Sequence, residues 1–291
     1  MLGKAFAGII GGGIATFVVY ANDVRKNKAH ASWTTNASPS TKWDKNWDRR
    51  DPESCVKPAK NDSPEQQNRY NEALQQHKPT AIRHLYLIRH GQYNLKGDSD
   101  RDLILTELGR KQADVTGQRL KQLNVPFSRM VFSTMARATE TARIIHGHFE
   151  HLPLEPCELI REGAPIPPEP PSGAWKPEAK VLTGHSLHFL HWLLEDALFF
   201  TDGARIEAGF RKYFYRASPS QAEDSHEIIV CHANVIRYWI CRALQFPPEG
   251  WLRFSLTNCS ISVVSILPSG RVLVRTVGDS GHLPKDMITT N

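Results

Sequence analysis

From Arg83 onward, short strand-like segments alternate with helix-like segments, and this alternation restricts the possible folds more than any other feature. Apolar runs predict strands over residues 84–88, 130–132, 154–160 and 228–231. Helical spacing of apolar residues predicts helices over 106–123, 135–148, 187–198, 204–215 and 234–244. Two further strands, 260–267 and 271–277, are joined by Pro-Ser-Gly and predict a hairpin. The pattern predicts an α/β fold of three layers, α/β/α.

Polar and charged groups follow four of these predicted strands. The groups are Arg89-His90-Gly91, Ser133 to Arg137, Arg161-Glu162-Gly163 and His232-Ala233-Asn234. Open α/β sheets bind ligands outside the carboxyl ends of their strands. One such residue alone would be an ordinary surface or packed group, but four sets at four strand ends predict a single site.

The residue types at these ends suit phosphoryl transfer. Arg89 and Arg137 carry planar forks that match phosphate oxygens. The His90 imidazole can attack phosphorus, and a protonated Glu162 can supply a proton to the departing oxygen. Gly91 would let backbone N–H groups approach the phosphate.

These motifs carry a family resemblance. The sequences Leu87 to Gly91, Ser133 to Ala142 and Cys231 to Asn234 together resemble the histidine phosphatase superfamily, with its phosphoglycerate-mutase-like fold. Residues 161–165 and 43–52 resemble its mitochondrial serine/threonine-protein phosphatase branch, over a span that reaches from the apolar start to residue 281. The resemblance implies that His90 accepts the phosphoryl group, Arg89 and Arg137 clamp it, Glu162 donates the proton and His232 hydrogen-bonds the transferring group. It further implies that Gly91, Ala233 and Asn234 bind substrate, and that no metal or organic cofactor is needed.

One departure from the family pattern favours hydrolysis of phosphate esters over a mutase reaction. Phosphoglycerate mutases follow Arg-His-Gly with Glu-Ser, whereas this chain has Gln92-Tyr93-Asn94. The resemblance therefore implies a phosphatase for phosphoserine and phosphothreonine in protein substrates, acting in mitochondrial signalling, dynamics or cell death. Two alternatives stay open: a phosphatase or mutase of small phosphomonoesters, and a scaffold whose catalysis is incidental.

Other sequence patterns are weaker candidates for chemistry. Cys231 and Arg237 have the C-x₅-R spacing of cysteine phosphatases, but the β-branched Val235 and Ile236 resist the tight phosphate loop that this chemistry needs. Two histidine clusters, 185–191 and 146–151, lack the convergence that metal ligands require, so no metal site is predicted. Five cysteines without a C-x-x-C pair argue against a disulfide scaffold.

The start of the chain predicts a membrane anchor. Residues 5–21 are uncharged and mostly apolar, close to the length of a short spanning helix, and Gly8 and Gly12 form a G-x-x-x-G pair. A cleaved signal ending at Ala21 and a soluble helix are the alternative interpretations. We expect a single-pass anchor over residues 1–22, and the resemblance implies a mitochondrial membrane, the outer rather than the inner.

The composition of residues 23–80 predicts a polar tether, which precedes a catalytic domain over residues 81–291. The tether holds a W-D-x-N-W-D motif within residues 43–52, whose two tryptophans are costly to leave in water. From the residues alone, the motif either folds back on its own domain or docks on another subunit. The resemblance implies docking that assembles homodimers into larger rings, through Trp43, Asp44, Asn46, Trp47, Asp48, Arg49 and Arg50.

The formal charge of +6 is concentrated at the start of the chain. Residues 1–80 hold 12 Lys and Arg against 8 Asp and Glu, and residues 81–291 hold 24 against 22. Because the catalytic domain is nearly balanced, its charge does not indicate nucleic-acid binding.

Overall fold

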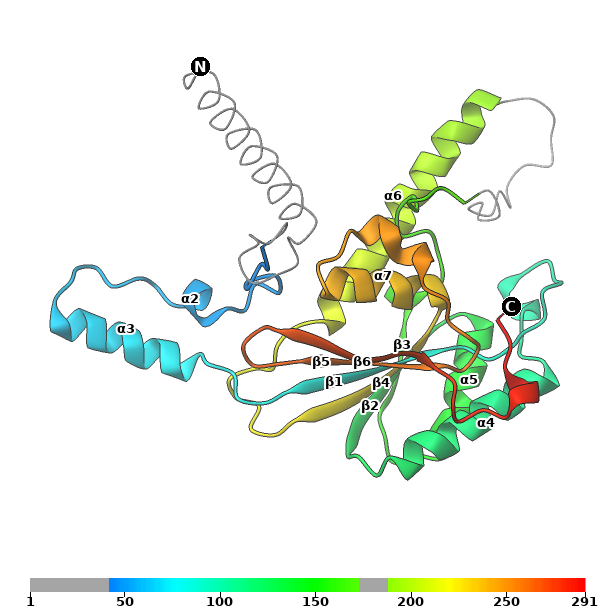
Figure 1. Ribbon diagram of the computed structural model, residues 1–291, viewed down its shortest axis with the longest axis horizontal. Helices are drawn as coiled ribbons and strands as arrows, with labels where there is room; N and C mark the ends of the chain where they lie inside the picture. Colours follow the sequence, from blue (N-terminus) through cyan, green and yellow to red (C-terminus); the bar gives the residue numbers. More distant parts are fainter. Residues whose placement is uncertain (1–41, 173–187, 291) are drawn as a thin grey trace, which may run out of the picture. The chain divides into compact units, whose positions relative to one another are not determined.

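A mixed sheet of six strands, in the order β3-β2-β4-β1-β5-β6, organises the domain that begins at Lys45 (Figure 1). The computed structural model describes residues 42–172 and 188–290, with only the backbone of 188–200. The strands are β1 (Arg83–Arg89), β2 (Phe127–Ser133), β3 (Leu154–Cys157), β4 (Ser225–Cys231), β5 (Ile261–Ile266) and β6 (Val272–Asp279). Strands β1 to β4 are parallel, and the hairpin β5–β6 adds two antiparallel strands at one edge. The predicted α/β class and the hairpin are confirmed.

Helices cover both faces of the sheet, because neighbouring strand residues point to opposite sides. Leu85 and Leu87 belong to the core under helices α6 and α7, while Tyr86 and Ile88 belong to the core under α4 and α5. Figure 1 shows these two pairs of helices on opposite sides of the strands. The helices are α2 (Pro52–Cys55), α3 (Pro64–Gln76), α4 (Glu107–Gln122), α5 (Ala136–His146), α6 (His188–Tyr213) and α7 (Ala233–Ala243). Short 3₁₀ turns are η1 (Asp100–Asp102), η2 (Glu158–Ile160), η3 (Pro248–Arg253) and η4 (Lys285–Met287).

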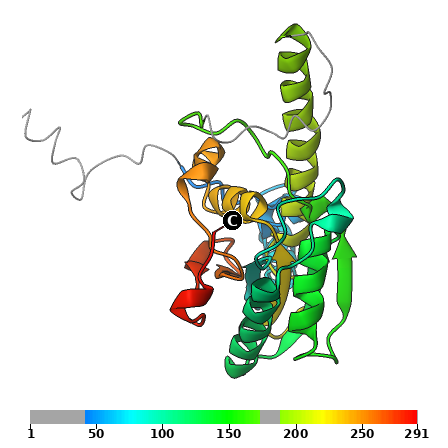
Figure 2. The ribbon, with the colours of Figure 1, turned by 90° about the vertical axis from the view of Figure 1, so that its right-hand side faces the viewer.

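Two predicted elements differ from the observed ones. The third strand ends at Cys157, and residues 158–160 form a 3₁₀ turn that brings the chain toward the site. The two helices expected over 187–198 and 204–215 are one continuous helix, α6, as Figure 2 shows. Gly203 does not end that helix: a Cβ there would lie 2.3 Å from the Pro165 carbonyl oxygen, so close packing accounts for this glycine.

Part of the predicted tether is helical. Helix α3 begins at Pro64, a residue suited to the first turn of a helix, and the Ser63 hydroxyl accepts a hydrogen bond from the Gln66 N–H at 3.4 Å. No residue of α3 is buried, which is why the sequence shows no apolar face there. Local capping signals therefore outweigh the missing periodicity.

The predicted anchor, residues 1–22, lies outside the described residues. Within residues 42–172 and 188–290, no helix has the length and apolar character needed to cross a membrane.

Candidate active site

The carboxyl ends of three neighbouring parallel strands bring the predicted residues together. Arg89 at the end of β1 pairs in register with Cys231 at the end of β4, so His90 and His232 follow side by side. The His90 N–H donates to the Cys231 carbonyl at 3.0 Å, and the two imidazole centroids lie 5.1 Å apart. Strand β2 delivers Ser133 to the same edge. This edge is where the sequence predicted the site.

His90 is neutral, with its Nε2 lone pair on the side of Arg137. Nδ1 lies 2.8 Å from the Gly91 carbonyl oxygen, which can only accept, so Nδ1 carries the proton. Nε2 then accepts from the Arg137 Nε–H at 3.3 Å. Burial, together with the charges of Arg137 and Arg89, lowers the pKa of His90 well below 6.5. A neutral imidazole with this tautomer can act as a nucleophile through Nε2.

Both predicted arginines have hydrogen-bonding capacity to spare, and the charges of both act on His90. Arg89 donates from Nη1 to the Leu256 carbonyl at 2.6 Å and to the Thr290 carbonyl at 3.0 Å. The Arg89 Nε and the Arg137 Nη1 are buried and have no hydrogen-bond partner in the described part of the chain. Buried N–H groups without partners are costly. Oxygens of a bound phosphoryl group would satisfy them.

His232 is fully buried behind the nucleophile. Its Nε2 lies 2.7 Å from the Ser133 hydroxyl, and its Nδ1 has no partner among the residues described. Burial, then the charge of Arg137 and the neighbouring His90, lowers the pKa of His232 well below 6.5. The second imidazole can therefore serve as a neutral hydrogen-bonding group.

Glu162 follows the 3₁₀ turn after β3 and is suited to carry a proton. Burial raises the pKa of Glu162 above 4.5, against the opposing effects of Arg137, Arg89 and two backbone N–H groups, those of Gly163 and Asn234. The Gly163 N–H donates to its carboxylate at 3.2 Å. A carboxyl group with a raised pKa beside two arginines can act as a general acid.

Of the three residues predicted to bind substrate, two have hydrogen-bond partners within the chain and the third is buried. The Gly91 N–H donates to the Thr141 hydroxyl at 3.0 Å, and a Cβ at Gly91 would lie 2.6 Å from the Gly109 carbonyl oxygen. Packing against α4 thus accounts for the glycine, and its predicted role in binding phosphate stays a prediction. Ala233 is buried at the start of α7. The Asn234 side chain donates to the Gly163 carbonyl at 3.2 Å and so holds the loop that carries Glu162.

Sequence reasoning missed several residues that build this edge. Asn258 donates from Nδ2 to the His90 carbonyl at 3.2 Å, and the Thr289 hydroxyl donates to the Asn258 Oδ1 at 2.8 Å. Asp100 has a carboxylate oxygen 3.7 Å from the Arg137 Nη1. Because these residues lie far from the motifs in the chain and follow no predicted strand end, no local signal could have marked them.

The alternative cysteine chemistry is excluded by the structure. Val235 and Ile236 lie in helix α7, so no loop of backbone N–H groups surrounds Cys231. Burial raises the pKa of the Cys231 thiol, so it stays protonated at neutral pH.

Two of the histidines weighed as metal ligands have other partners, and His151 is exposed. His146 pairs with the Leu152 carbonyl at 2.9 Å, and His148 with Asp114 at 2.8 Å. No cluster of metal-ligating residues occurs in the described part of the chain. His185 and the side chains of His188 and His191 lie outside it.

The W-D-x-N-W-D motif contacts its own domain in this single chain. The Trp47 indole N–H donates to the Gly270 carbonyl at 2.8 Å, and Asp48 pairs with Arg216 at 2.9 Å. Arg50 lies over the Tyr215 ring, 4.0 Å from its centroid. Trp43 remains 36% exposed. Docking of this motif on another subunit stays a prediction.

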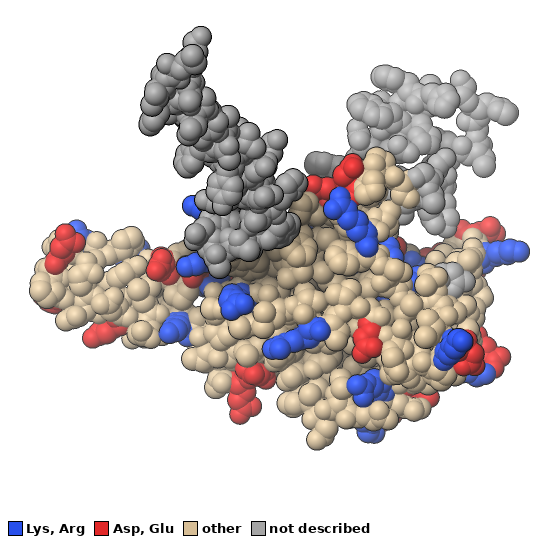
Figure 3. Space-filling model, viewed as in Figure 1, with Lys and Arg blue, Asp and Glu red and all other residues tan. Residues whose placement is uncertain are grey.

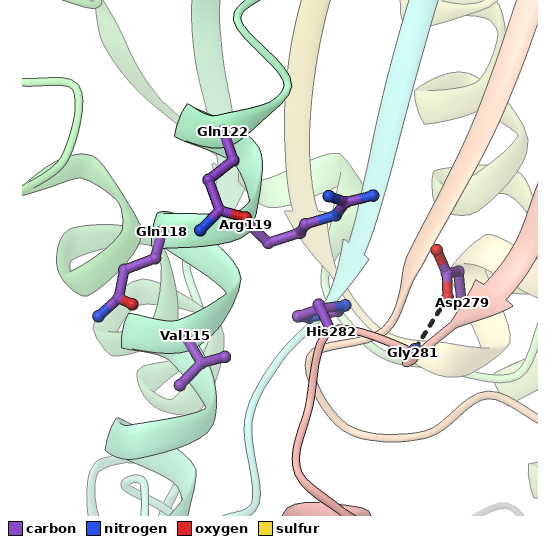
Figure 4. Close-up of a pocket in the computed structure, with 7 residues that line it drawn as sticks. All are labelled: Val115, Gln118, Arg119, Gln122, Asp279, Gly281 and His282. Carbon is purple, nitrogen blue, oxygen red and sulfur yellow. Dashed lines mark hydrogen bonds between the residues drawn. The ribbon is translucent and has the colours of Figure 1, made fainter.

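A cavity of about 540 Å³ lies away from the catalytic residues, between α4 and the end of β6 (Figure 4). Arg119 and His282 contribute its basic groups, and Asp279 accepts a hydrogen bond from the Gly281 N–H at 2.9 Å. On the face in Figure 3, basic and acidic side chains alternate over the described residues. That mixture agrees with the balanced charge of residues 81–291.

Comparison with known proteins shows the family of the chain. The family model of the histidine phosphatase superfamily (branch 1) matches residues 85–165 and 204–278, and the chain belongs to this family. The match omits residues 166–203, which contain the first half of α6.

Similar proteins come from flies and from the malaria parasite. The chain is 48% identical to "Serine/threonine-protein phosphatase Pgam5, mitochondrial" of Drosophila pseudoobscura pseudoobscura, over 98% of this chain and 94% of the relative. The protein of the same name from Drosophila persimilis is also 48% identical over the same shares. Among solved structures, phosphoglycerate mutase from Plasmodium falciparum is 32% identical, with a TM-score of 0.47, over 71% of this chain and 96% of that one.

Proposed function

We propose that this chain is a serine/threonine-protein phosphatase that works through a phosphohistidine on His90. The observation that carries the proposal is the buried His90, whose Nδ1 lies against the Gly91 carbonyl while its Nε2 accepts a hydrogen bond from Arg137. The fly relatives that match nearly the whole chain carry the name of such an enzyme. Phosphoproteins are therefore its substrates.

The first half of the reaction transfers the phosphoryl group to the enzyme. The His90 Nε2 lone pair forms a bond to phosphorus in line with the departing oxygen of the serine or threonine side chain. As that P–O bond breaks, the protonated Glu162 gives its proton to the oxygen, and the alcohol leaves. The N–H groups of Arg89 and Arg137, with His232, stabilise the charge on the other three oxygens.

The second half restores the enzyme. The Glu162 carboxylate takes a proton from a water molecule, whose oxygen bonds to phosphorus while the N–P bond to His90 breaks. Inorganic phosphate leaves, and both residues return to their starting states. The low pKa of His90 helps this step, because a weakly basic imidazole is a good leaving group.

The decisive experiment compares His90→Ala with Cys231→Ala on phosphoserine peptides. His90→Ala should abolish turnover and the acid-labile phosphoenzyme, whereas Cys231→Ala should keep both. Turnover by His90→Ala would overturn the mechanism. Faster hydrolysis of phosphoglycerate than of phosphopeptides would instead indicate a small-molecule phosphatase.

The remaining expectations extend the proposal to the rest of the chain. Residues 1–22 anchor the protein in a mitochondrial membrane, the outer one, and residues 23–80 tether the catalytic domain, residues 81–291. The motif within residues 43–52 joins homodimers into larger rings. Support comes from the apolar start, the paired tryptophans and the mitochondrial names of the fly relatives.

A further inference from the structure

Tyr93 contacts both His90 and Arg137, although no motif predicts a role for it. Its ring meets the His90 imidazole edge to face, with centroids 5.1 Å apart and an interplanar angle of 84°. The Arg137 guanidinium carbon lies 4.6 Å from the centroid of the same ring. One aromatic ring thus contacts both the imidazole that attacks phosphorus and the guanidinium that binds the phosphate oxygens.

The backbone around Tyr93 is held firmly enough to fix that ring. Tyr93 forms an isolated antiparallel bridge with Leu105. The Asn94 N–H donates to the Ile104 carbonyl at 2.9 Å, and the Thr106 N–H donates to the Gln92 carbonyl at 3.0 Å. Backbone hydrogen bonds on both sides of the residue restrict the positions that its side chain can take.

The resting hydrogen bond of Arg137 creates the need for such a support. Its Nε–H is bonded to the lone pair that His90 uses for attack, so this bond must break before phosphorus can be reached. Asp100 is a second neighbour of Arg137, at 3.7 Å, but a carboxylate repels the phosphate that replaces the resting bond. A cation–π contact has no fixed donor–acceptor direction, so Arg137 can turn its N–H groups to phosphate oxygens while it stays over the ring.

We infer that Tyr93 is a positioning residue. Its ring keeps Arg137 and His90 in position while Arg137 gives up its hydrogen bond to the His90 lone pair and forms hydrogen bonds to phosphate oxygens. The role belongs to the ring, through its π face. The inference rests on the proposed function for its kinetic consequences. Binding of inorganic phosphate to the resting enzyme tests it independently of turnover.

The test compares two substitutions in the full-length chain. Tyr93→Phe keeps the ring and should remain within about twofold of the wild type in kcat/KM. Tyr93→Leu keeps most of the volume and loses the π face, and should lower kcat/KM and weaken the binding of inorganic phosphate, measured by calorimetry, each about tenfold. Leu95→Ala, an exposed position two residues along the same loop, is the control and should match the wild type.

A double-mutant cycle separates positioning from general damage to the loop. In an Arg137→Gln background, Tyr93→Leu should cost less than twofold in residual aryl phosphate hydrolysis, because the cation is absent. A tenfold cost in both backgrounds would overturn the inference, and so would equal losses for Tyr93→Phe and Tyr93→Leu.

If Tyr93→Leu does not fold, pentafluorophenylalanine at position 93 keeps the shape and reverses the charge on the ring face. It should weaken phosphate binding, and unchanged binding would contradict the inference.

Discussion

Asp48 and Arg216, 168 positions apart in the chain, form an ion pair of 2.9 Å in which both side chains are almost completely buried. Asp48 also accepts from the Arg216 backbone N–H at 2.8 Å. The pair ties the tryptophan motif to the loop after α6. Asp51 is a second acidic partner of Arg216, at 3.2 Å, so removing the Asp48 charge leaves the buried guanidinium only partly compensated, which is destabilising.

We therefore expect Asp48→Asn to lower the free energy of unfolding by about 3 kcal/mol, measured by urea denaturation of the full-length chain. Glu53→Gln, an exposed acid close by in the sequence, is the control and should change it by less than about 0.5 kcal/mol. Unchanged stability in Asp48→Asn would mean that the motif does not rest on its own domain in solution.

The tryptophan motif should also control assembly. If it docks on another subunit, replacing Trp43 and Trp47 together by Ala removes the two large apolar rings of the contact. Sedimentation should then show dimers in place of larger oligomers, with lower phosphatase activity. An unchanged sedimentation profile would leave Trp47 with only the contact to its own domain that the structure shows.

The pH dependence should reflect the opposite shifts of the catalytic groups. Glu162 must be protonated to act as an acid, so kcat/KM should fall as pH rises through its raised pKa. His90 must be neutral, and because its pKa lies well below 6.5 the acid limb should appear only well below that pH. Initial rates from pH 4 to 9 on a phosphopeptide test both limbs.

Glu162→Gln should remove the alkaline limb. It should also slow phosphoserine peptides far more than activated aryl phosphates, whose leaving groups need no proton. Equal losses on the two substrates would remove Glu162 from the role of acid.

Gly91 offers a test of packing at the nucleophile. Because an added Cβ would lie 2.6 Å from the Gly109 carbonyl oxygen, Gly91→Ala must displace the end of β1 or the start of α4. We expect a loss of about 1–3 kcal/mol in stability and a clear fall in kcat. Gly250→Ala is the matched control, since its nearest neighbours would be 3.6 Å away. A stable Gly91→Ala enzyme that had lost only phosphate affinity would support the predicted role of Gly91 in substrate binding.

The anchor prediction is tested by deletion. Removing residues 1–22 should move the protein from the carbonate-resistant membrane fraction to the soluble fraction, because no other apolar segment of the described residues suits a membrane. Retention in the membrane would place the attachment elsewhere in the chain.

The sequence predicted the catalytic edge because strand ends and polar residues follow each other directly in the chain. Arg89, His90, Arg137, Glu162 and His232 were found this way, and the structure brings them together. Tyr93 contacts Arg137, Asn258 contacts His90 and the Thr290 carbonyl contacts Arg89 across distant segments, which no local pattern reports. The role expected for the Gly91 N–H stays a prediction. The close packing of Gly91 depends on Gly109 in helix α4, which the sequence does not mark as a neighbour.

The hydrogen bond from Arg89 to Thr290 has a consequence for how the enzyme is made. The two residues are separated by 201 positions, so a growing chain contains the nucleophile long before it contains the carbonyl that orients Arg89. The catalytic edge is completed only after residue 290 has left the ribosome. A nascent chain paused before that point carries every motif residue and still holds Arg89 by one carbonyl instead of two.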